Sequence, residues 1–212
     1  MRLNHDLLLD PVTYALKRRA LRHEQIAYRR ERALAFGPGM RLQFEDERTL
    51  HYQVQEMLWA EGVLDAAGIQ DQLAAYACLL PNGLDWRACL SIELPDARQR
   101  LRELPALSRA AHRFELAVGT ERIDVFANED LPDRHLDRPS AVHFLRFGLT
   151  RGMRRALRAG EGATLTCTHA AYRVSRELPA TLLDRLCVDI DESLVRDNAP
   201  PPPPHWASLR AA

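Results

Sequence analysis

The chain has 212 residues, of which 46% are hydrophobic and 27% are charged. This composition is that of an ordinary globular protein, and it excludes a wholly disordered chain and a glycine-periodic fibre. The 29 basic residues balance the 29 acidic ones, so no net charge attracts nucleic acid or an anionic membrane. Four cysteines without a CxxC pair, and no long apolar run near the N-terminus, predict a cytoplasmic protein with free thiols.

The first part of the chain is predicted to be mostly helical. Asp10 followed by Pro11 is typical of a helix start, and this helix is expected to run to about Leu34. The residues expected on its inner face are Leu16, Ala20, His23 and Ala27. Further along the chain, Asp46 is expected to cap a helix that runs from about residue 47 to residue 61.

The rest of the chain is predicted to alternate between strands and short helices. Alternating apolar and polar residues indicate strands over 40–44, 87–94, 114–118, 122–127 and 163–174. Residues 140–149 are apolar on both faces, which is typical of a central strand. Short helices are expected over 96–105, over 150–159 and from Pro179 onward.

These elements predict one α+β domain over residues 1–197. Consecutive strands lie close enough along the chain to pair in antiparallel fashion, so we expect helices packed on an antiparallel or mixed sheet of five to six strands. The segment 198–212 contains five consecutive prolines. Because such a run cannot join a folded core, this segment is expected to be a disordered tail.

Two carboxylates of the helix predicted over 47–61 are the first candidates for a site, since the sequence contains no nucleotide-binding, serine-hydrolase, zinc or di-iron motif. Glu61 is expected on the apolar stripe of this helix, and Glu56 on a second face beside Tyr52 and Trp59. A carboxylate held among aromatic rings would have a raised pKa and could donate a proton or bind a metal ion. In the alternative interpretation, Glu61 points into solvent and Glu56 pairs with an arginine.

Two polar residues of the predicted central strand are the second candidates. His143 shares a strand face with Leu145 and Phe147, whereas Arg146 lies on the opposite face. Burial of either side chain is costly unless it is paired. His143 therefore needs a hydrogen-bond partner or a metal ion, and Arg146 needs a carboxylate or an anionic ligand. A core histidine and a structural ion pair are the alternative.

Two further patterns are less specific. Four arginines share one stripe of the helix predicted over 150–159 and could bind phosphates, or face solvent and pair with acids: Arg151, Arg154, Arg155 and Arg158. Cys167 and His169 share a strand face, but two ligands do not make a metal site.

Four segments, LQFEDERTLHYQVQEMLWAEGV, GIQDQLAAYACLLPNG, ANEDLPDRH and SAVHFLRFGLT, resemble the bacterial domain-of-unknown-function family 3501 over about Leu42 to Leu149. The resemblance brings no reaction. It implies a link to rubrerythrin-like or iron–sulfur redox proteins, whose genes often lie beside those of the family. Its segments contain the polar residues Glu45, Asp46, Gln55, Glu56, Glu61, His143 and Arg146.

Three functions follow as hypotheses. The first is a redox-associated accessory or ligand-binding protein, with a pocket between the helix over 47–61 and the strand over 140–149. The residues expected to line this pocket are Glu56, Glu61, His143 and Arg146. The second is an enzyme that uses iron or manganese held by His143 and the carboxylates. The third is a nucleic-acid binder that uses the arginine-rich helices.

Overall fold

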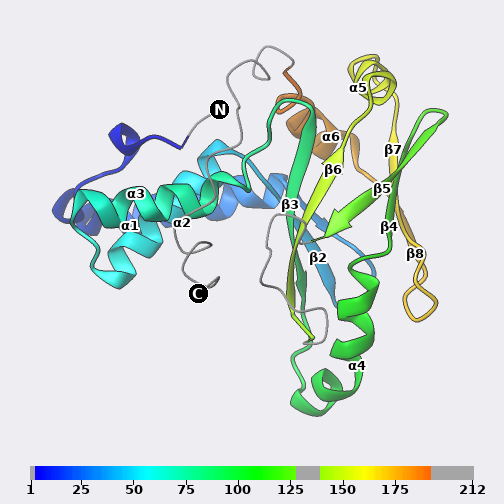
Figure 1. Ribbon diagram of the computed structural model, residues 1–212, viewed down its shortest axis with the longest axis horizontal. Helices are drawn as coiled ribbons and strands as arrows, with labels where there is room; N and C mark the ends of the chain where they lie inside the picture. The colour runs from blue at the N-terminus through cyan, green and yellow to red at the C-terminus, as the bar shows by residue number, and fades with distance from the viewer. Residues whose placement is uncertain (1–2, 128–138, 192–212) are drawn as a thin grey trace, which may run out of the picture.

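The computed structural model describes residues 3–127 and 139–191 (Figure 1). Within them eight strands form one sheet, in the order β1-β2-β3-β6-β5-β4-β7-β8, and every neighbouring pair is antiparallel. The sheet curls into a half-barrel (Figure 1). The strands are β1 (Ala33–Ala35), β2 (Met40–Glu45), β3 (Asp85–Ile92), β4 (Phe114–Val118), β5 (Glu121–Ala127), β6 (Val142–Gly148), β7 (Ala163–Cys167) and β8 (Val174–Glu177).

Six α-helices and one 3-10 turn complete the described part of the chain. They are η1 (His5–Leu7), α1 (Pro11–Glu31), α2 (Glu47–Glu61), α3 (Ala66–Ala77), α4 (Ala97–Ala110), α5 (Arg151–Arg158) and α6 (Ala180–Cys187). The α+β class is confirmed. None of the described helices is long and apolar enough to cross a membrane. The predicted proline-rich tail lies outside the described residues.

The predicted sheet of five to six strands is too small, because two short edge strands were missed. Helix α1 ends at Glu31 and not near Leu34, since Leu34 belongs to β1 and pairs with Leu42 of β2. Gly37 and Gly39 adopt positive φ in the turn between these two strands, a conformation that glycine adopts without steric cost. The strand predicted over 163–174 ends at Cys167 as β7, and β8 begins only at Val174 and pairs with β7.

Helix α4 also differs from its prediction, because it continues past Pro105 to Ala110. A proline inside a helix removes the hydrogen bond to the carbonyl four residues earlier, here that of Leu101. The Leu101 side chain is 81% exposed, so this turn faces solvent and water can satisfy its carbonyl. The chain therefore tolerates a proline that the sequence marks as a helix end.

The main core fills the inner face of the half-barrel. Phe44, Trp86 and Phe147 from three adjacent strands form a ring cluster, with centroids 5.5 to 6.5 Å apart. Helices α4, α5 and α6 add apolar side chains to the same core. Helices α5 and α6 lie at one end of the sheet and α4 at the other (Figure 1). The alternation of the strands therefore places one continuous apolar layer under three helices.

Helices α1, α2 and α3, together with η1, project to one side of the half-barrel (Figure 1); we call them the helical arm. The arm has a small core of its own, formed by Val54, Leu58 and Leu73. The predicted inner face of α1 is wrong, because its four residues are exposed: Leu16, Ala20, His23 and Ala27. Tyr14 and Gln25 are the residues that α1 buries. The pattern of apolar residues predicted the wrong inner face because the buried face of α1 carries polar groups.

A buried charged network joins the helical arm to the half-barrel. Arg32, which caps the end of α1, is 2% exposed. Its guanidinium forms an ion pair with Asp189, which follows α6, and lies 3.4 Å from Oδ2 of Asp46. It also donates to the carbonyls of Phe44 and Glu45 at the end of β2. One side chain thus connects α1, β2, α2 and the segment after α6.

Candidate functional site

The helical arm contains an open pocket of about 420 Å³ between η1, α1 and α2. Small-molecule sites in proteins commonly have volumes of this order, with apolar walls and a few polar groups. The lining residues are Leu7, Leu9, Tyr14, Leu21, Gln25, Glu47, Arg48, His51, Tyr52 and Gln55. Leucines and tyrosines therefore form much of the wall, and most of the polar groups come from α2.

The segment before α1 is held over α2 by specific hydrogen bonds. The Gln55 side chain accepts from the backbone N–H of Leu9 at 2.7 Å and donates to the Leu9 carbonyl at 3.1 Å. Asp10 then caps α1 by accepting from the backbone N–H groups of Val12 and Thr13. The wall that Leu7 and Leu9 form is therefore fixed by the amide of Gln55 and by the cap of α1.

His51 anchors the N-terminal end of this segment. Its Nε2 accepts from the backbone N–H of Asn4 at 2.9 Å and lies 3.3 Å from the Asn4 carbonyl. Its Nδ1 lies 2.9 Å from the Glu47 carbonyl, to which it donates within α2. Both ring nitrogens thus contact backbone groups, one in the segment before α1 and one within α2.

Glu56 lies behind two tyrosines of the pocket wall. Its Oε1 accepts from the hydroxyls of Tyr14 at 2.6 Å and Tyr52 at 3.0 Å, and Arg18 donates to both carboxylate oxygens. These hydrogen bonds, with that of Arg18 the strongest, lower the pKa of Glu56 to about 2. The predicted raised pKa is therefore wrong, and the alternative interpretation of an arginine partner is confirmed. Glu56 fixes the tyrosines and is not a proton donor.

Gln25 is a buried polar residue of the pocket with one unpartnered atom. The side chain is 8% exposed, and its Nε2 donates to the Arg48 carbonyl at 3.5 Å. In the part of the chain that the structure describes, its Oε1 is the single buried side-chain oxygen or nitrogen that has no hydrogen-bond partner. A buried acceptor without a partner costs about 1–3 kcal/mol. Gln25 therefore lines the pocket and keeps one buried acceptor, Oε1, that has no hydrogen-bond partner.

The structure does not bring the four predicted site residues together. Glu61 lies at the exposed end of α2, where it accepts from Gln72 of α3 at 2.8 Å. Helix α2 packs against α1, α3 and β2, and the expected pocket between α2 and β6 does not gather these side chains. The known contacts of Glu56 and Glu61 are all within the helical arm.

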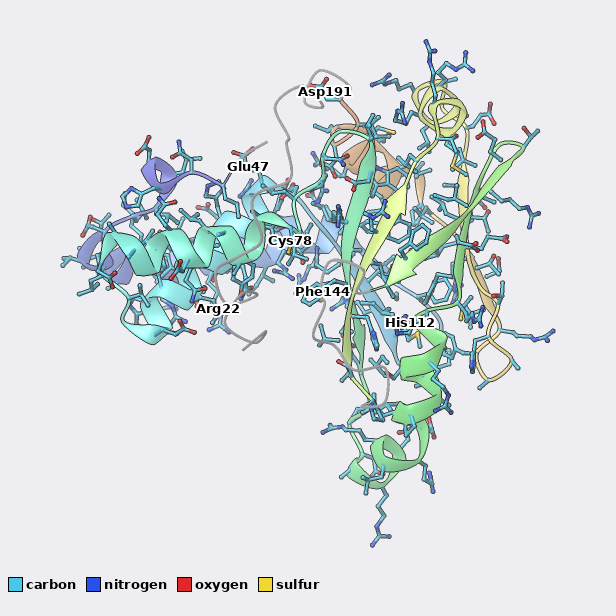
Figure 2. All side chains as sticks on the ribbon, in the orientation of Figure 1. Arg22, Glu47, Cys78, His112, Phe144 and Asp191 are labelled. Atoms are coloured by element: carbon cyan, nitrogen blue, oxygen red, sulfur yellow. The ribbon has the colours of Figure 1, made fainter. Side chains whose placement is uncertain are left out.

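His143 lies on the inner face of β6, beneath α4. Its Nε2 is 3.3 Å from the Ser108 hydroxyl and 3.0 Å from the Ser140 carbonyl, and its ring centroid is 5.5 Å from that of His112. Figure 2 shows His112 at the end of α4, on the half-barrel and away from the arm. His143 is therefore a hydrogen-bonded core histidine, as one of the two interpretations predicted.

Arg146 lies on the outer face of the same strand. It pairs in register with Arg87 of β3, and its guanidinium carbon lies 5.1 Å from the ring centroid of Phe126. No group of three or more His, Cys, Asp and Glu side chains that could hold a metal ion occurs within residues 3–127 and 139–191. The predicted iron or manganese site of His143, Glu56 and Glu61 is thus not assembled there.

The arginine stripe of α5 has structural contacts at two of its four positions. Arg154 is buried and donates to the Leu149 carbonyl at 2.6 Å, and Arg158 donates to the Ile190 carbonyl at 3.1 Å. Only part of the stripe therefore faces outward. Cys167 is buried in the main core, where desolvation raises its pKa.

Sequence reasoning missed most of the pocket because its polar residues carry no motif. Gln55 was noted only as part of the family resemblance. Gln25 and His51 sit at helical positions that resemble ordinary surface residues. One signal was available in the sequence, since Tyr14, Gln25 and Tyr28 are spaced so that they share one face of α1. This spacing indicates the buried face only if that face is allowed to be polar.

Comparison with known proteins confirms the predicted resemblance and extends it beyond residues 42–149. The family model described as "Protein of unknown function (DUF3501)" matches residues 2–190. A crystal structure of a protein of unknown function from Burkholderia pseudomallei K96243 is 37% identical, covers 90% of this chain and 100% of its own, and has a TM-score of 0.86. None of the curated proteins matches. The chain therefore belongs to the DUF3501 family.

Proposed function

We propose that the protein binds a small, mostly apolar molecule that carries one hydrogen-bond donor, in the pocket between η1, α1 and α2. The observation that carries this proposal is the buried, unpartnered Oε1 of Gln25 in the wall of a pocket of about 420 Å³. Leu7, Leu9 and Leu21 offer apolar contacts to the rest of such a ligand. The Gln25 amide would turn toward a hydroxyl or amide N–H of the ligand, which would supply the hydrogen bond that the buried Oε1 lacks.

The fixed hydrogen bonds around the pocket support a binding role over a catalytic one. Glu56 is ionised and saturated by two tyrosines and an arginine, and His51 has both nitrogens occupied. Both groups already have hydrogen-bond partners, so each of them helps to fix the wall of the pocket. Rigid walls of this kind lower the entropic cost of binding a ligand.

The test compares two isomeric probes, 1-octanol and heptyl methyl ether, by isothermal titration calorimetry. The alcohol can donate to Gln25 and the ether cannot. One hydrogen bond contributes about 0.5–1.5 kcal/mol, so the alcohol is expected to bind about twofold to tenfold more tightly. Gln25→Leu should abolish this preference, whereas Gln70→Leu on the exposed face of α3 should leave it intact.

A second variant tests the location of the pocket. Leu21→Trp places a larger ring in the wall and should weaken the binding of both probes by at least tenfold. The proposal is wrong if the native chain binds neither probe, or if Gln25→Leu retains the preference for the alcohol. It is also wrong if Leu21→Trp folds normally and binds octanol as well as the native chain does.

The partner implied by the family resemblance, a rubrerythrin-like or iron–sulfur protein, stays a prediction. It rests on the resemblance alone and is independent of the pocket. Anaerobic purification of the chain with each candidate protein, followed by iron analysis of the eluted complex, would test it. An iron-containing complex of fixed stoichiometry is the expected result.

A further inference from the structure

The outer face of α1 combines exposed apolar and cationic side chains. Val12 is 71% exposed, Leu16 83% and Ile26 45%. At 100° per residue, three exposed arginines fall on the same side of the helix as these apolar residues. We define the α1 outer face as Val12, Leu16, Arg19, Arg22, Ile26 and Arg30. This face extends about 27 Å along the helix, from residue 12 to residue 30.

The cations of the α1 outer face differ from the other arginines of α1, which are used within the fold. Arg18 pairs with Glu56, and Arg29 lies 3.7 Å from Glu45. By contrast, the three arginines of the outer face form no ion pair with any residue in the described ranges 3–127 and 139–191. The two acids of the helix, Glu24 and Glu31, lie to the side of this face by the same angular count, and Glu31 already pairs with Arg185. The face is thus positively charged, although the whole chain is neutral.

We propose that the α1 outer face is a docking surface for an acidic amphipathic helix of a partner protein. Apolar residues of such a helix would cover Val12, Leu16 and Ile26, and its carboxylates would pair with the three arginines. Arginine is enriched in protein interfaces, and the buried centre of an interface is apolar. Opposite charges on the partner would fix how the two helices align. The face belongs to the arm and lies apart from α4, as the positions of Arg22 and His112 show (Figure 2).

The charge pattern selects this occupant over three others. A second copy of the chain that packs through the same face would bring arginines against arginines. A helix lying in a membrane needs an apolar face with its cations at the edges, but Arg19 and Arg30 lie on the same line of the helix as Val12. Nucleic acid would pair with the arginines and leave Leu16 and Val12 without apolar contacts.

The test uses the full chain and a designed probe. The probe is a fluorescein-labelled 21-residue helical peptide with leucine at the heptad a and d positions and glutamate at e and g. A second peptide has lysine at every glutamate position. The acidic peptide is expected to bind in the micromolar range by fluorescence anisotropy, and its affinity should fall when salt is raised. The lysine peptide should bind at least tenfold more weakly.

Two sets of variants locate the binding. The triple variant R19E, R22E and R30E should reduce the affinity for the acidic peptide by at least tenfold and raise that for the lysine peptide. The double variant V12Q and L16Q should reduce both affinities. The matched control is R98E, R102E and L101Q on α4, which also exposes two arginines and a leucine, and it should change neither.

Several outcomes would overturn the proposal. It fails if the native chain does not bind the acidic peptide, or if the α4 control loses binding to the same extent as the α1 variant. It also fails if the α1 charge reversal abolishes binding to vesicles of phosphatidylserine and phosphatidylcholine, or to a 20-base-pair DNA duplex, and leaves peptide binding unchanged. Circular dichroism of each variant verifies that loss of binding is not loss of fold, and a gain of affinity for the lysine peptide cannot arise from unfolding.

Discussion

The half-barrel and the helical arm bury different kinds of side chain. The half-barrel closes over one continuous apolar core that eight strands and three helices share. The arm has a small apolar core, and its helices are also connected by polar groups such as Glu56 and Gln55. Polar contacts need exact partners, so they hold a few groups rigidly and leave space between helices. The candidate pocket lies among such polar contacts, between η1, α1 and α2.

The largest expected effect concerns Arg32, which joins the two regions. Arg32→Met removes the cation and leaves Asp46 and Asp189 buried without it. Breaking a buried pair on one side costs about 3–5 kcal/mol. We expect a decrease of this size in the free energy of unfolding, measured by urea denaturation at pH 7.

The control for this prediction is Arg185→Met, which breaks the exposed pair with Glu31. Exposed ion pairs contribute about 0–1 kcal/mol, so this variant should be close to the native chain. If both variants lose the same small amount, the junction does not depend on the buried network. The helical arm and the half-barrel would then be joined by contacts other than the ion pairs of Arg32.

A matched pair of leucine substitutions compares the two cores directly. Leu145 is 2% exposed in the half-barrel and Leu58 is 6% exposed in the arm. Leu→Ala costs more where the surroundings cannot relax into the cavity. We expect a loss of about 3 kcal/mol for Leu145→Ala and about 2 kcal/mol for Leu58→Ala. Hydrogen exchange should show that Leu58→Ala opens the arm while the half-barrel stays protected.

The same difference between an apolar core and a polar interior explains how well the sequence predicted each region. Strand β3 was found because its residues alternate where one face meets an apolar core, and β6 was found because its segment is apolar on both faces. The cap of α2 was also found, since Asp46 and Thr49 form a local capping box. Edge strands β1 and β8 were missed because three or four residues carry too little pattern.

The candidate site was harder to predict because its residues act through long-range contacts. Glu56 was singled out for its aromatic neighbours, but the direction of its pKa shift depends on Arg18, which lies 38 residues earlier. Gln25 has significance only because α1, α2 and η1 surround it. Nothing within a short window of sequence specifies that its Oε1 lacks a partner.

The pH dependence of stability tests the polar interior of the arm. The pKa of Glu56 is lowered to about 2 in the folded chain by its bond with Arg18, whereas a glutamate in an unfolded chain has a pKa of about 4.3. The ionised carboxylate therefore stabilises the fold above pH 4, and this stabilisation is lost as the pH falls toward 2. Glu56→Gln should cost about 2 kcal/mol at pH 7, and less at pH 3.

Urea denaturation at the two pH values measures this difference, and Glu61→Gln on the same helix is the control. Glu61 is exposed and bonds only with Gln72 among the contacts that the structure gives it, so its substitution should have a small effect at both values. If Glu56→Gln lowered the free energy of unfolding equally at pH 7 and pH 3, the charge of the carboxylate would not contribute to stability. The arm would then resemble the half-barrel more closely than the hydrogen bonds indicate.

The smallest expected effect belongs to Leu16, and it distinguishes the two descriptions of α1. If Leu16 lay on the inner face, as its hydropathy suggests, Leu16→Gln would bury an amide and cost several kcal/mol. Leu16 is 83% exposed, so we expect a change within about 0.5 kcal/mol. Tyr14→Phe, by comparison, removes the hydrogen bond to Glu56 and should cost about 1 kcal/mol. Thermal unfolding of both variants decides whether the polar face of α1 is the buried one, and a larger loss for Leu16→Gln than for Tyr14→Phe would reverse the assignment.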